Sequence, residues 1–314
     1  MKKISIIIAV YDIEDYISKC LDSVIKQKGE DIEIIIVDDG STDNSLNICK
    51  KYQKKDKRIC IISQDNKGLN MVRNVGFDNS NGEYIWHIDG DDYIDDNSID
   101  VLRKYIDKYD IIYFNYNRII KNKIEKINNN KSYGSLGDKY ILGNVGVWNK
   151  IVKREIFENE RFPEGCSYND YYVIPTLLYK TNNIKFIDNY LYNYVYHNNS
   201  LSHTRKFYLE DFLYCLNHVY EKLYKNYPDA IECFYVNHLL FYNYGKEIRF
   251  GHKYNYKELN KLLKKKFPKY YKNKYYNRNI FMKIYIRLMY YDIILLVKLI
   301  TFIKFKVIKE LTRR

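Results

Sequence analysis

The sequence predicts an α/β fold, in which a mostly parallel sheet carries helices on both faces and a helical, basic extension follows. Three observations predict it. Short apolar, β-branched runs alternate with segments of 3.6-residue apolar periodicity through the first half of the chain. Two of these apolar runs stop abruptly at acidic residues. After about His203 the chain is rich in Leu, Tyr and Lys and has a helical pattern.

The alternating elements justify a parallel sheet, because parallel strands need helical crossovers between them. A helix with apolar positions from Tyr16 to Ile25 follows the first strand, and another begins near Gly68. The predicted strands are 4–10, 32–37, 58–63, 84–88 and 111–115, and two further predicted helices are 42–54 and 97–108. From 118 to 146 the pattern becomes polar, which indicates a surface excursion between two halves.

The most informative stretch reads I-W-H-I-D-G-D-D-Y (85–93). A strand buried on both faces would deliver Asp89, Asp91 and Asp92 to its carboxyl end, where open α/β sheets bind ligands. Carboxylates two residues apart repel each other unless a cation lies between or beside them. Magnesium or manganese held by carboxylates and phosphates is the usual solution. A solvated acidic turn is the alternative for so short a motif.

A second strand end carries acids as well. Residues 32–45 read I-E-I-I-I-V-D-D-G-S-T-D-N-S, in which Asp38 and Asp39 precede a Gly40 turn and helix-capping residues. Two strand ends of this kind in one sheet can bracket a ligand. Turn chemistry and capping alone are the alternative for these two acids.

Composition excludes several classes of protein. The chain has 314 residues, is 46% apolar and lacks a Pro- or Gly-rich segment, so a packed core is expected rather than disorder. The six cysteines are scattered without zinc-like spacing, which is typical of a reducing, cytoplasmic compartment. The basic start and short apolar run at 4–10 lack a signal-peptide cleavage site. No Walker A or G-x-G-x-x-G motif follows the first strand.

The net charge of +13 is concentrated at one end. Residues 251–314 hold 18 Lys and Arg against three acids, whereas residues 1–250 are near neutral. The apolar runs 293–297 and 299–303 are interrupted by charge, so an interfacial helix on an anionic membrane is predicted rather than a spanning one. A solvated tail or an oligomer contact is the alternative. No nucleic-acid recognition fold accompanies the charge.

Six pieces of the chain, in this order, carry a family resemblance. They are S-I-I-I-A-V-Y-D (5–12), I-I-V-D-D-G-S-T-D (35–43), N-K-G-L-N-M-V-R-N-V-G (66–76), G-E-Y-I-W-H-I-D-G-D-D (82–92), W-N-K (148–150) and Y-N-D-Y-Y (168–172). Together they resemble an inverting family 2 glycosyltransferase of the GT-A fold, the group that builds bacterial capsule, exopolysaccharide and lipopolysaccharide. The resemblance covers roughly residues 1–205.

The resemblance implies a nucleotide site. It assigns nucleotide contacts to Ala9, Val10, Tyr11, Asp39, Gly68, Arg73, Asp89 and Ser200. Tyr11 would offer a stacking face to a uracil ring, and Asp39 would contact the base. Arg73 would meet the negative charge of the donor or anchor the acidic loop, and an ordinary helix-surface cation is the alternative.

The resemblance also implies a divalent cation, Mn²⁺ or Mg²⁺. Asp91 would bind it directly, Asp89 would reach the ribose or the ion, and Asp92 would hold the loop. His197 resembles part of the late segment that closes over the diphosphate, and it is a further candidate metal ligand. The cation would neutralise the leaving diphosphate.

Asp170 resembles the catalytic base, the one carboxylate that an inverting displacement needs to take the acceptor hydroxyl's proton. A plain helix N-terminal acid is the alternative. The chain departs from the family pattern here, because an acid pair is usual and this chain has Asn169 before Asp170. It also has Ala9 where Pro is common and Asp12 where Asn is common.

These inferences predict three segments and one activity. Residues 1–117 form a nucleotide-sugar-binding half, 118–205 an acceptor and catalytic half, and 206–314 a helical, basic extension. The expected enzyme transfers a hexose, with UDP-hexose as donor, to a lipid-linked or growing surface glycan at the inner face of the cell membrane. It is expected to be non-processive, since Q-x-x-R-W is absent. A non-catalytic nucleotide-sugar-binding partner in a membrane-bound assembly complex is the alternative. The glycine-free A-V-Y-D-I-E-D stretch argues against a nucleotidyltransferase.

Overall fold

A computed structural model describes residues 3–121, 123–128, 144–197, 200, 208–242, 256–278, 280–293, 295–297 and 299–300. Most of the expected surface excursion between 118 and 146, and the last residues of the extension from 301 on, lie outside the described residues. The chain divides into two compact units, Met1–Val219 and Tyr220–Arg314. The predicted boundaries at 117 and 205 stay predictions.

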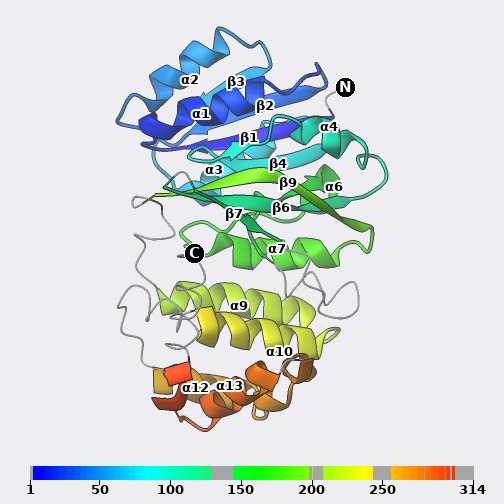
Figure 1. Cartoon of the computed structure of the whole chain (residues 1–314). Coiled ribbons are helices and arrows are strands. Elements are labelled where there is room, and N and C mark those ends of the chain that lie inside the picture. Colours follow the sequence, from blue (N-terminus) through cyan, green and yellow to red (C-terminus); the bar gives the residue numbers. More distant parts are fainter. Residues whose placement is uncertain are drawn as a thin grey trace. The chain divides into compact units, whose positions relative to one another are not determined.

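The first four long strands form the parallel sheet that the alternation predicts. Their spatial order is β3-β2-β1-β4, so β1 lies between the two strands that end in acids (Figure 1). The bounds are β1 Ile4–Val10, α1 Glu14–Ile25, β2 Ile32–Asp38, α2 Ser45–Gln53, β3 Ile59–Ser63, α3 Leu69–Asp78 and β4 Tyr84–Asp89. Strand β2 is buried along its whole length and β1 at every position except Ala9, as expected of strands covered on both faces.

The second half adds antiparallel pairings that the sequence did not indicate. Its elements are β5 Tyr93–Ile94, α4 Ser98–Arg103, β6 Ile111–Ile120, β7 Lys123–Ile127, β8 Lys150–Lys153, α6 Arg154–Phe157, α7 Asn169–Tyr179 and β9 Ile184–Tyr196. Strand β8 runs antiparallel to β4 and β6, while β9 is parallel to β6. The predicted excursion begins with an antiparallel β6–β7 hairpin, because β6 continues five residues beyond the predicted strand end.

Helices cover both faces of the sheet, as predicted. Along β1, Ile6 and Ile8 pack in the cluster that includes α1, α2 and α4, whereas Ile7 packs in the cluster that includes α3, α6 and α7. Gly76 lets α3 lie close to β1, because a Cβ at this position would overlap the side chain of Ile7. The α/β class is therefore confirmed, with a mixed sheet.

The rest of the described chain is helical, as its periodicity predicts. The elements are α9 Leu209–Leu223, α10 Pro228–Val236, the π-helix η1 Asn237–Tyr242, α12 Tyr256–Lys266, the 3₁₀ segments η2 Tyr270–Lys272 and η3 Lys274–Arg278, and α13 Ile280–Tyr290. Within the described ranges, none of these helices is long and apolar enough to cross a bilayer.

Candidate active site

The two acidic strand ends, those of β2 and β4, flank the carboxyl end of β1. In the sheet register Val10 pairs with Asp38 and Ala9 pairs with Asp89, so the three carboxyl ends are level. The backbone N–H of Asp39 donates to the carbonyl of Val10 at 2.9 Å, and that of Gly90 donates to the carbonyl of Ala9 at 3.0 Å. Parallel register thus brings both acidic loops to one edge, the place where α/β sheets bind ligands.

Asp39 is held mainly by backbone amides. Its carboxylate accepts from the N–H groups of Lys67 at 2.9 Å and Gly68 at 2.8 Å, and from the Gln64 amide at 2.7 Å. Gly68 has φ of +84°, a conformation that favours glycine, and a Cβ there would meet open space. The side chain of Asp38 accepts from the Ser63 hydroxyl at 3.0 Å and from the Ser41 N–H at 3.4 Å. Asp39 therefore shapes the loop that begins α3.

The acids after β4 have different surroundings. Asp92 is buried and accepts from the Tyr192 hydroxyl at 2.6 Å and the Val195 N–H at 2.7 Å, which ties the acidic loop to β9. Burial raises the pKa of Asp92 well above its usual range, and the charges of Asp91 and Asp89 raise it further. Asp92 is thus a loop anchor.

Asp91 contacts a histidine that is distant in sequence. Its Oδ2 lies 2.8 Å from Nε2 of His197, at the end of β9. The His197 ring stacks on Tyr16 of α1 with ring centroids 4.3 Å apart. Its buried Nδ1 has no hydrogen-bond partner within the described part of the chain. The pair therefore presents a carboxylate oxygen and an imidazole nitrogen side by side.

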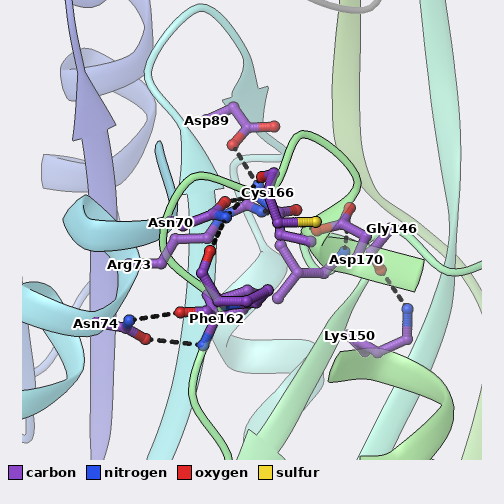
Figure 2. A network of polar contacts seen from close by, with 12 residues as sticks. Asn70, Arg73, Asn74, Asp89, Gly146, Lys150, Phe162, Cys166 and Asp170 are labelled. Carbon is purple, nitrogen blue, oxygen red and sulfur yellow. Dashed lines mark hydrogen bonds and ion pairs between the residues drawn. The ribbon is translucent and has the colours of Figure 1, made fainter. Parts of the chain in front are cut away.

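Arg73 joins the acidic edge to the predicted base. Its guanidinium contacts Asp89 Oδ1 at 3.1 Å through Nη2, and Asp170 Oδ1 at 2.8 Å and Asn169 Oδ1 at 3.0 Å through Nη1. Figure 2 shows this arginine between the two carboxylates. The side chain is only 3% exposed, which excludes the helix-surface alternative. Its plane lies over Phe162, 5.3 Å from the ring centroid.

Burial and charge act in opposite directions on these groups. Burial alone would lower the pKa of the Arg73 guanidinium, but the adjacent Asp170 and Asp89 carboxylates raise it above its ordinary value. Burial raises the pKa of Asp89 to about 6, although Arg73 opposes the shift. The charged form of Asp89 therefore depends on Arg73.

Helix α3 also holds the segment that precedes Asp170. Asn74 both donates to the carbonyl of Phe162 at 2.8 Å and accepts from its N–H at 3.0 Å. Asn70 donates to the carbonyl of Cys166 at 2.7 Å and accepts from the Asn169 amide (Figure 2). These asparagines and Arg73 share one helix face. The sequence analysis missed both asparagines, although polar residues at i, i+3 and i+4 in N-M-V-R-N were the available signal.

Lys150 is a further residue to which the sequence analysis gave no role, although it lies in the W-N-K piece. It is 1% exposed, and its ammonium donates to the carbonyls of Gly146 and Asn144 and to Asn149 Oδ1. Burial lowers the pKa of Lys150 well below its ordinary range, with Asp170 acting in the opposite direction. The N–H of Val147, in the loop that Lys150 holds, points to Asp170 Oδ2 at 3.4 Å. Lys150 thus supports the base from the opposite side to Arg73.

A model of the protein family named Glycosyl transferase family 2 matches residues 5–166, just over half of the chain. The chain belongs to glycosyl transferase family 2. The matched span includes both acidic strand ends, α3 and the Lys150 loop, and it ends shortly before Asp170. The predicted family and the predicted enzyme class, a glycosyltransferase, are confirmed.

Solved structures confirm the GT-A fold of this glycosyltransferase. The structure of residues 1–349 of S. aureus TarS in complex with UDP-GlcNAc superposes with a TM-score of 0.70 at 22% identity, covering 79% of this chain and 76% of that one. The mannosyltransferase PcManGT from Pyrobaculum calidifontis, in complex with GDP-Man and Mn²⁺, gives a TM-score of 0.50 at 12% identity, covering 91% and 85%. At these identities the likeness establishes the fold alone.

Curated relatives of this glycosyltransferase include two from Streptococcus pneumoniae serotype 4. Glycosyltransferase GlyA is 34% identical over 64% of this chain and 31% of its own length, and glycosyltransferase GlyG is 30% identical over 64% and 73%. Putative glycosyltransferase EpsH of Bacillus subtilis is 36% identical over 50% and 49%. The match thus spans under a third of GlyA and about half of EpsH.

The structure brings most of the predicted site residues of the glycosyltransferase together, although their roles stay predictions. Ala9 and Val10 contact the two acidic loops, and Tyr11 follows them as a 48% exposed ring. Ser200 lies beyond His197, to whose carbonyl its N–H donates at 3.3 Å. Within the described residues, His, Cys, Asp and Glu side chains form no group of three or more that could hold a metal ion.

Proposed function

We propose that this glycosyltransferase transfers a hexose from a UDP-sugar to a hydroxyl of a lipid-linked or growing surface glycan, with inversion and one sugar per encounter. One observation carries the proposal. A single buried guanidinium, that of Arg73, contacts Asp89 of the acidic loop and Asp170 at the start of α7. The acid expected to face the donor and the acid expected to act as base therefore border one site, as a single displacement requires.

The donor side of the proposal rests on the loops around β1. Asp39 offers carboxylate oxygens beside the open space above Gly68, and the exposed Tyr11 ring offers a stacking surface for a base. The TarS structures contain UDP-GlcNAc and UDP, which supports a uridine nucleotide here. Arg73, itself occupied by two carboxylates, acts on the donor through the position of Asp89.

Asp91, after β4, and His197, after β9, fit a divalent cation. Neighbouring ligands of an octahedral ion with bonds of about 2.1 Å lie roughly 3 Å apart, and Asp91 Oδ2 and His197 Nε2 are 2.8 Å apart. The Nδ1 of His197, unpartnered within the described chain, can carry the ring proton, so that Nε2 is deprotonated and can bind a metal ion. Two protein ligands are enough, because Mg²⁺ and Mn²⁺ usually take the rest from phosphates and water. When bound, the cation would neutralise charge on the leaving diphosphate.

Asp170 is the proposed base. Its Oδ1 is oriented by Arg73 and its Oδ2 by the Val147 N–H, and the side chain remains 21% exposed. Each carboxylate oxygen has a second lone pair, so the acceptor hydroxyl can still donate its proton to Asp170 as its oxygen attacks the anomeric carbon. The C–O bond to the diphosphate breaks in the same displacement.

A donor-consumption assay tests the proposal. The purified full chain is incubated with Mn²⁺ and a panel of UDP-hexoses, and UDP release is measured for wild type, Asp91→Asn, Asp170→Asn and Asp96→Asn. Asp96 is an exposed acid in the same region with one surface ion pair, so it is the matched control. We expect UDP release to be lost in the first two variants and kept in the control. Nucleotide binding without turnover in wild type would instead favour the non-catalytic partner.

We further propose that the enzyme works at an anionic membrane surface, the inner face of the cell membrane. The excess of 18 basic over three acidic residues in 251–314 supports this location.

A further inference from the structure

The described part of the C-terminal unit exposes large apolar side chains. Of the eleven large hydrophobic residues that are exposed in the described chain, seven lie between 280 and 299. We call five of these the apolar stripe: Ile280, Ile284, Tyr291, Leu295 and Leu299. The first two lie on α13, and the other three follow its end at Tyr290. Their exposed fractions run from 50% at Ile284 to 84% at Leu295.

The apolar stripe is exposed even though the same region also has a packed core. Helix α13 also has a buried side, on which Ile286 and Met289 are fully covered and Tyr285 is 6% exposed. The helix therefore has apolar residues on both sides and buries only one. Outside this region the other exposed apolar residues are spread over separate elements, as is normal for a protein surface. A cluster of this kind marks an interaction surface.

Lysines lie in the adjoining helix. On α12, Lys257, Lys261 and Lys265 are exposed and spaced four residues apart, so they share one face. The two helices are connected at Asp292, whose carboxylate accepts from Asn260 at 2.6 Å and from Lys264 at 2.8 Å. Asn260 also donates to the carbonyl of Met289 at 2.9 Å. The lysine face and the apolar stripe therefore belong to one packed unit.

We propose that the lysine face of α12 and the apolar stripe, which begins on α13 and continues past its end, form a docking surface for an anionic lipid bilayer. This inference rests on the membrane location proposed above and names the surface and the lipid class. Isoleucine and leucine side chains enter the boundary between headgroups and acyl chains, while the lysines contact lipid phosphates. A second copy of the chain is a poorer occupant, because two segments that each carry 18 basic and three acidic residues repel each other.

Vesicle sedimentation with the full chain tests this surface. The vesicles contain phosphatidylcholine alone or phosphatidylcholine mixed with phosphatidylglycerol, and the variants are Ile284→Glu with Leu295→Glu, and Lys261→Gln with Lys265→Gln. Ile124→Glu is the control, since Ile124 is 64% exposed on β7, outside this unit. We expect binding to anionic vesicles only, about tenfold weaker for the glutamate pair and severalfold weaker for the glutamine pair, with the control unchanged.

Three results would overturn the inference. The first is equal vesicle binding by the glutamate pair and wild type, and the second is equal binding to both kinds of vesicle. The third is a wild-type dimer in sedimentation velocity that dissociates in the glutamate pair. Thermal unfolding of each variant checks that the substitutions, all at exposed positions, leave the fold intact. UDP release in the absence of vesicles is measured on the same samples. Release that persists while vesicle binding is lost separates a failure of docking from a failure of the proposed catalysis.

Discussion

The donor side and the acceptor side of the site are built in different ways. On the donor side, the ends of β1, β2 and β4 are aligned by sheet register, and Asp39 is held by two backbone N–H groups and one side chain. On the acceptor side, Asp170 depends on Arg73 and on a loop held by Lys150, with Asn70 and Asn74 fixing the preceding segment. Backbone-built geometry tolerates side-chain change, whereas geometry built from buried polar side chains does not.

Substitution of Arg73 is expected to have the largest effect, because it links both sides. Arg73→Ala leaves Asp89 and Asp170 without their buried partner, which typically costs about 3–5 kcal/mol of unfolding free energy. UDP release should fall at least about 10²-fold as the carboxylates lose their relative position. Arg73→Lys should not retain wild-type UDP release, since one ammonium cannot contact both carboxylates in the way that the planar guanidinium does.

Urea unfolding and UDP release measure both effects. Arg118→Ala is the control, because Arg118 forms a surface ion pair with Glu125 and should contribute less than about 1 kcal/mol. An Arg73→Ala variant as stable and active as this control would contradict the linking role.

Lys150→Met tests the acceptor side alone. The substitution removes the Lys150 donor from the Gly146 carbonyl and from Asn149 Oδ1, at a typical cost of about 1–3 kcal/mol for each unsatisfied group. The turnover number should fall while the KM for the donor stays unchanged, because the donor loops keep their backbone contacts. Lys153→Met is the matched control, as Lys153 makes a partly exposed ion pair with Glu155. A rise in the donor KM with an unchanged turnover number would show that Lys150 supports the donor side and not the acceptor side.

A pH series of unfolding in metal-free buffer tests the electrostatics of Asp89. Its folded-state pKa of about 6 exceeds the ordinary 3.8, so between these values the folded chain binds more protons than the unfolded chain. Stability should therefore decrease as pH rises from about 4 to about 6, by up to roughly 1.4 kcal/mol per pH unit from this group. Buried Asp92, whose pKa is also raised, adds a slope of the same sign. Asp89→Asn should flatten the wild-type slope, and an unchanged slope would exclude Asp89 as its source.

The smallest effect is expected on the donor side. Gln64→Ala removes one of the contacts to Asp39 and leaves the N–H groups of Lys67 and Gly68 in place. Affinity for UDP, measured by calorimetry, should weaken by less than about 1 kcal/mol. Asp39→Asn should be much more harmful, since an amide nitrogen cannot accept from these donors. Equal losses in the two variants would show that this side also depends on individual side chains.

The parallel core and the acidic strand ends were predictable because both follow from local patterns. Ile-rich runs with alternating helices indicate buried parallel strands, and acids placed directly after two of them must reach the same sheet edge. The β8 insertion between β4 and β6 was not predictable, because its four residues pair with strands far apart in the sequence. Helix α4 is likewise shorter than its apolar pattern suggested, ending at Arg103.

The sequence by itself determined the family, the strand ends and the chemical types at the site, since residue order and periodicity carry that information directly. Only the tertiary structure decided how these groups are supported. Arg73 meets Asp170 across 97 positions, His197 meets Asp91 across 106, and Lys150 is buried among carbonyl oxygens. Such contacts arise when a mixed sheet closes and removes polar groups from water, because most buried polar groups then need a partner wherever the fold provides one.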